Sequence, residues 1–240
     1  MSAPRLLASG VVLALGYAIT GGLYWTLLNV PESSVVMLAV SLLLVIAGVA
    51  CAGVAIGAAI AVAQGASARE ASVSGVRALP LFVLGLLLLG ILIWLTEGAE
   101  NWWEAHSGEV DALALRYLKT NRTSVVHIAV YWLLWLVRWG LGLSLLGGLS
   151  AAGALRARAR KGLRSGLSWL PLLAVIAAVL VYNLLVWRFA YWRPEQLATS
   201  REMAFVSLKF ALMYVILIVL TAAALAVHGR RVRTLAEPAP

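Results

Sequence analysis

Six apolar runs, each long enough to cross a membrane, constrain this chain more than any other feature. A helix needs about 20 apolar residues to cross a hydrocarbon core of about 30 Å. Six such runs in 240 residues leave room only for short connections. We therefore expect an all-α integral membrane protein in which residues 1–240 form a single domain. The six spans are expected at about residues 6–30, 35–63, 78–96, 125–154, 169–190 and 203–227.

The composition excludes a soluble domain beyond the loops. Hydrophobic residues make up 62% of the chain and charged residues 12%, whereas a soluble domain has about 25% charged residues. The mean hydropathy is +0.94. The single cysteine, Cys51, lies inside an apolar run, which excludes an intrachain disulfide and a cysteine zinc cluster.

The first span has two interpretations. Arg5 followed by an apolar run is typical of a signal peptide, but the run is long and no clear Ala-x-Ala cleavage site follows it. We favour a retained membrane anchor and keep the cleaved signal as the alternative.

The net charge is +9, and the basic residues that cause it lie in short loops and in the C-terminal tail. This distribution indicates the topology of the chain in the membrane and does not predict a nucleic-acid partner. If the N-terminus is cytoplasmic, eleven of the 19 Lys and Arg residues lie on that side. We therefore expect both termini in the cytoplasm. The chain has 16 arginines and abundant Ala, Leu, Gly and Val, a composition typical of a GC-rich bacterial genome, and we expect a multi-pass protein of the inner membrane.

Small residues recur at intervals of four in the second and fourth spans. Such rows let helix backbones approach closely in lipid. We interpret them as packing faces within the bundle, with contacts to a second copy or to membrane partner subunits as the alternative. The rows are Ala47, Cys51, Ala55, Ala59 and Ala63, then Gly53, Gly57, Ala61 and Gly65, and finally Gly140, Ser144, Gly148 and Ala152.

A short motif occurs twice, at residues 74–81 and 165–172. Both copies read Ser-Gly-x-x-x-Leu-Pro-Leu, and both follow a basic loop and enter an odd-numbered span. This repetition favours an architecture of three tandem helical hairpins, although chance recurrence of common residues is the alternative.

The longest connection, residues 97–124, is expected to be an extracytoplasmic loop with an amphipathic helix at about residues 108–119. Its apolar residues follow the i, i+3, i+4 pattern of one helical face, and Ser107 is a candidate cap. We expect its acidic residues to form a solvated surface, and a metal or acid–base site is the less favoured alternative because no His-Glu-x-x-His motif is present. The polar residues concerned are Glu100, Glu104, His106, Glu109 and Asp111.

Arg138 is the most unusual residue of the chain, because it lies about midway along the fourth span. No Asp or Glu falls within the predicted core of any span. A charge at that depth needs a partner, which we expect among backbone carbonyls, trapped water, Asn183, a surface acid or an anionic ligand. Trp135 and Trp139 flank it and are candidates for cation–π contact.

Two further polar residues, Asn183 and Lys209, are expected at a depth comparable with Arg138. We hypothesise that Arg138, Asn183 and Lys209, with Trp135 and Trp139, form a ligand-binding site. The favoured function is a transporter-like protein or membrane-complex subunit with a cationic intramembrane site for an anionic amphiphile such as a lipid. The alternatives are a structural scaffold without a ligand and, less favoured, an intramembrane enzyme, since no catalytic, cofactor or metal motif is present.

Overall fold

The fold is entirely helical in the part of the chain that the structure, a computed structural model, describes: residues 2–31, 34–118, 124–191 and 199–236. Six of the helical segments are long and apolar enough to cross a membrane, which confirms the predicted fold class. In chain order the elements are α1 (Ala3–Leu28), α2 (Val35–Ala63), α3 (Ala68–Leu118), α4 (Ser124–Trp135), the π-helical turn η1 (Leu136–Leu141), α5 (Gly142–Ala154), α6 (Ala159–Gly166), α7 (Trp169–Tyr191) and α8 (Thr199–Ala236).

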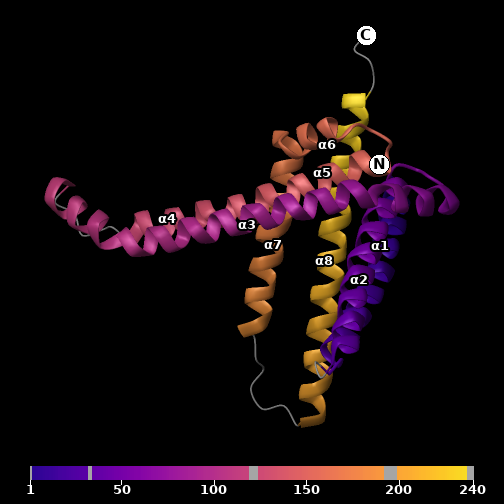
Figure 1. The fold of residues 1–240 in the computed structure, drawn as a ribbon, viewed down its shortest axis with the longest axis horizontal. Coiled ribbons are helices and arrows are strands. Elements are labelled where there is room, and N and C mark those ends of the chain that lie inside the picture. The colour runs from indigo at the N-terminus through magenta and orange to yellow at the C-terminus, as the bar shows by residue number, and fades with distance from the viewer. Residues whose placement is uncertain (1, 32–33, 119–123, 192–198, 237–240) are drawn as a thin grey trace.

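The long helices run in two directions (Figure 1). Helices α1, α2, α7 and α8 extend the same way, with α1 against α2 and α7 against α8. Helix α3 packs against the consecutive elements α4, η1 and α5. Together these elements cross the direction of the other helices and project beyond them. The start of α1 and the end of α8 lie at the same end of the molecule.

Helix α3 is longer than the sequence predicts. It continues without a break for 51 residues through most of the segment expected to be a loop. The separate amphipathic helix expected at residues 108–119 is instead the last part of α3, and residue 119 lies outside the described ranges. Ser107, the predicted cap, lies inside this helix and donates to the carbonyl oxygen of Glu104 at 3.0 Å.

Small residues bring the helix backbones together, as the spacing in the second and fourth spans predicts. A Cβ atom built on Gly57 would lie 2.5 Å from the Cβ of Ala78 and 3.0 Å from the Cα of Gly75, both on α3. In the fourth span, Ser144 donates to the carbonyl oxygen of Gly166 at 2.7 Å. These contacts lie within one chain and confirm the packing interpretation for these residues.

The repeated motif has a structural counterpart. Gly75 of the first copy contacts Gly57 of the preceding helix, and Gly166 of the second copy contacts Gly148 in the same manner. The copies differ after this point, because α3 continues through its motif whereas α6 ends at Gly166 and α7 begins at Trp169. Two helical hairpins of the chain are therefore built on the same backbone contact.

The closest of these contacts provides a test of the packing. Gly16→Ala places a Cβ on that of Ala55, so the α1–α2 pair must separate, and we expect a loss of about 1–3 kcal/mol in unfolding free energy. Gly21→Ala on the same helix is the control, because nothing lies within 4 Å of its new Cβ. Thermal unfolding in detergent micelles measures both variants, and equal stability of the two would contradict the packing.

Candidate functional site

Arg138 lies on the π-helical turn η1 and is neutralised by an acid. Its Nη2 lies 2.6 Å from Oε2 of Glu100, and its Nε donates to Oγ1 of Thr96 at 2.8 Å. Their side chains are 16% (Arg138) and 26% (Glu100) exposed. The partner is therefore one of the acids expected in the loop, which reaches Arg138 because α3 continues past the predicted end of the third span.

Further side-chain contacts join α3 and α4 beyond this ion pair. Tyr131 donates to Glu104 at 3.2 Å. The indole N–H of Trp103 donates to Nδ1 of His127 at 3.1 Å, which leaves the proton of the neutral ring on Nε2, 2.8 Å from Asp111. Two acids of the predicted solvated surface, Glu104 and Asp111, thus have partners on α4.

A metal site is not supported in this segment. In the ranges that the structure describes, no three His, Cys, Asp or Glu side chains are grouped closely enough to hold a metal ion. Glu104 instead joins α3 to Tyr131 of α4, and Glu100 joins it to Arg138 of η1.

Three of the predicted site residues line one cavity. Trp135, Trp139 and Asn183 surround a space of about 410 Å³, together with residues of α8. Asn183 donates its side-chain N–H to the carbonyl oxygen of Val179 at 2.8 Å. The cavity is thus lined mainly by apolar groups and uncharged polar ones.

The two predicted cations do not join this cavity. Arg138 projects from the same turn toward α3, where Thr96 and Glu100 hold it. Lys209 places its ammonium 4.9 Å from the centre of the Phe205 ring on its own helix. Within the described residues, Arg138 is thus bound to α3, and neither cation is among the residues that line the cavity beside Asn183.

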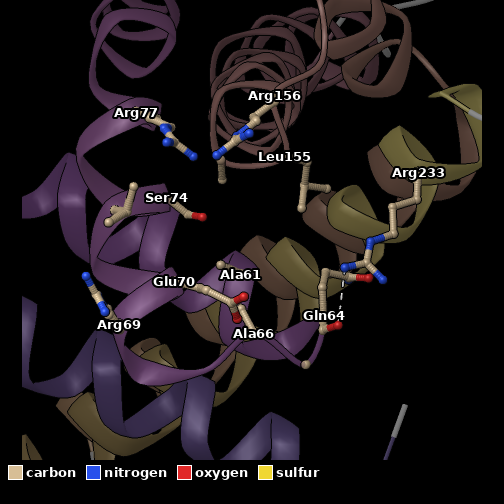
Figure 2. A pocket seen from close by; sticks show the side chains of 13 residues that line it. Ala61, Gln64, Ala66, Arg69, Glu70, Ser74, Arg77, Leu155, Arg156 and Arg233 are labelled. Atoms are coloured by element: carbon tan, nitrogen blue, oxygen red, sulfur yellow. Dashed lines mark hydrogen bonds between the residues drawn. The ribbon is translucent and has the colours of Figure 1, made fainter.

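A second polar cavity, which the sequence interpretation missed, lies at the end of the molecule where α1 begins and α8 ends (Figure 2). Its volume is about 550 Å³. Four arginines from three separate segments line it: Arg69 and Arg77 on α3, Arg156 after α5, and Arg233 on α8. These residues appear in the sequence only as scattered loop charges, which is why they were interpreted as a topology signal.

One carboxylate, that of Glu70, accompanies the four arginines. Its Oε2 accepts hydrogen bonds from the backbone N–H and the hydroxyl of Ser67, both at 2.9 Å. This is a capping box at the start of α3, so the carboxylate already has a structural role. On the far wall, Arg233 donates to the carbonyl oxygen of Gln64 at 3.2 Å. The arginine-lined cavity therefore carries an excess of positive charge.

No family model, no curated protein and no solved structure matches this chain. The functional proposal therefore rests on the geometry of its own residues.

The ion pair of Arg138 and Glu100 can be tested with a double-mutant cycle. Removing one member leaves the other charge poorly solvated, so Arg138→Leu and Glu100→Leu should each lower the unfolding free energy by about 3 kcal/mol or more. The double variant should recover most of this loss. Arg188→Leu, at an exposed arginine near the end of α7, is the control. Additive losses in thermal unfolding would show that the two side chains do not interact.

Proposed function

We propose that this chain is a multi-pass protein of a bacterial inner membrane that binds an anionic amphiphile, with the headgroup in the arginine-lined cavity. The observation that carries the proposal is the convergence of four arginines from α3, α5–α6 and α8 on one cavity that contains a single carboxylate. Such a protein acts as a transporter-like binding protein or as a lipid-binding subunit of a membrane complex. The proposal involves no catalytic step.

The electrostatics favour a phosphate-bearing ligand. Like charges around a concave surface raise the local concentration of anions. Arginine offers a planar fork of N–H donors that matches phosphate oxygens, and such charge-assisted bonds are stronger than neutral ones. A phosphate headgroup would therefore neutralise the cavity and satisfy donors from several helices at once.

The proposed orientation places this cavity at the cytoplasmic surface. The cavity lies at the end of the molecule where α1 begins and α8 ends (Figure 1), and the basic residues that line it give the positive charge expected inside. A lipid headgroup in the inner leaflet would lie at this depth. The arginine-rich composition supports the bacterial assignment.

The cationic site of this proposal is the arginine-lined cavity rather than Arg138. Glu100 already neutralises Arg138, so this residue no longer requires an anionic ligand. The same ion pair favours the alternative function, a structural scaffold, because it serves only to join two helices. Lipid binding distinguishes the two functions.

The test compares two pairs of arginines on the full chain in detergent micelles. Arg77→Gln with Arg233→Gln removes two charges from the cavity, and we expect about a tenfold loss of affinity for short-chain phosphatidylglycerol, since each factor of ten corresponds to about 1.4 kcal/mol. Arg158→Gln with Arg160→Gln removes the same charge from exposed positions outside the cavity and should change affinity less than twofold.

Microscale thermophoresis gives the affinities, with phosphatidylcholine of the same chain length as the neutral reference. An equal loss of lipid affinity in both double variants would show that binding depends on general surface charge, and it would contradict binding in the cavity. Equal binding of the two lipids by the unmodified protein would favour the scaffold.

A further inference from the structure

Arg156 has an unusual backbone conformation. Its φ angle is 55°, and it is the non-glycine residue with positive φ in the described part of the chain. This left-handed region is unfavourable for a residue with a Cβ, and non-glycine residues held in it cluster at ligand sites. The turn after α5 therefore holds an arginine where glycine is the usual residue.

The chain itself shows that glycine suits this turn. The turn after α2 has Gly65 at the equivalent position, with a φ of 92°. The same closing bond is present in both turns: Ala66 N–H donates to the carbonyl of Ala61 at 3.0 Å, and Ala157 N–H donates to that of Ala152 at 2.8 Å.

The sequence offset between these turns equals the offset between the two Ser-Gly-x-x-x-Leu-Pro-Leu motifs. The two turns are thus matching parts of one repeated hairpin, and glycine satisfies the backbone of the first. The backbone of the second turn does not require an arginine, so the side chain is what distinguishes it from the first.

The side chain of Arg156 points into the arginine-lined cavity, toward the guanidinium of Arg77 (Figure 2). A tight backbone contact positions the two residues, because a Cβ on Gly153 would lie 2.8 Å from the Cα of Ala78 and 3.2 Å from the carbonyl oxygen of Arg77. Among the residues that the structure describes, neither guanidinium takes part in an ion pair. Two cations are thus held facing each other by a rigid contact on one side and a strained turn on the other.

We propose that Arg77 and Arg156 form a subsite for a terminal phosphate, meaning a phosphomonoester or the end of a diphosphate. This inference rests on the proposed function and names the class of ligand. A terminal phosphate carries about −1.5 to −2 charges near neutral pH and three acceptor oxygens, enough for two arginine forks at once. A phosphodiester has one charge and two free oxygens, so it engages the pair less completely.

The experiment measures selectivity on the full chain in detergent micelles. The probes are short-chain phosphatidic acid, which has a terminal phosphate, and short-chain cardiolipin, which has comparable charge but only phosphodiesters. We expect phosphatidic acid to bind at least about tenfold more tightly, because each additional charge-assisted bond is worth about one such factor.

Two variants separate the side chain from the backbone strain. Arg156→Gly should abolish the preference for phosphatidic acid and also raise the unfolding temperature without ligand, because glycine relieves the left-handed turn. Arg156→Lys keeps the charge but loses the fork, and should reduce the preference to less than threefold. Arg158→Gln, at an exposed position next to the turn, should leave both affinities unchanged.

The outcomes distinguish this inference from the proposed function. Equal affinity for the two anionic lipids, or a preference that survives in Arg156→Gly, overturns the terminal-phosphate subsite while anionic binding stands. Failure of both lipids to bind better than phosphatidylcholine overturns the proposed function itself. If phosphatidic acid is preferred, its displacement by inorganic phosphate at a concentration similar to that of the lipid supports the subsite with a soluble phosphate compound as its ligand. Lack of displacement supports it with a lipid.

Discussion

The close approach of helix backbones through glycine and alanine is the constraint on which the rest of this structure depends. Apolar side chains gain little by leaving lipid for one another, so membrane helices associate through close packing and hydrogen bonds. The contacts of Gly16 with Ala55, Gly57 with Gly75, and Gly153 with Ala78 place helices nearer than larger residues would allow. The contact of Gly153 with Ala78 also brings Arg77 and Arg156 close to each other. The packing of the helices therefore also places positive charges in the cavity.

The spans could be predicted from sequence because apolar length alone decides whether a helix can cross a hydrocarbon core. The continuation of α3 past its apolar run could not, because it depends on partners on another helix. Glu100 is held by Arg138, and Asp111 by His127. A rule that ends a membrane helix at the first polar residues therefore misplaces the end of α3. These polar residues bind side chains of a neighbouring helical segment as well as water.

Arg138 was visible in the sequence because it is isolated in an apolar run, but its partner was not. The arginine-lined cavity shows the reverse difficulty, since its four arginines lie in three stretches that each appear to be ordinary basic loops. One signal was nevertheless present. Extending the repeated motif backward aligns Arg156 with Gly65, so the second copy has an arginine where the turn of the first has glycine.

The length of α3 has a mechanical consequence. At about 1.5 Å per residue its 51 residues extend for about 75 Å, more than twice the thickness of a hydrocarbon core. Its first turns line the arginine-lined cavity, and its far part is bound by Tyr131 and His127 of α4 and by Arg138 of η1. Because the helix is continuous, a tilt of one degree about its cavity end would move its opposite end by about 1.3 Å.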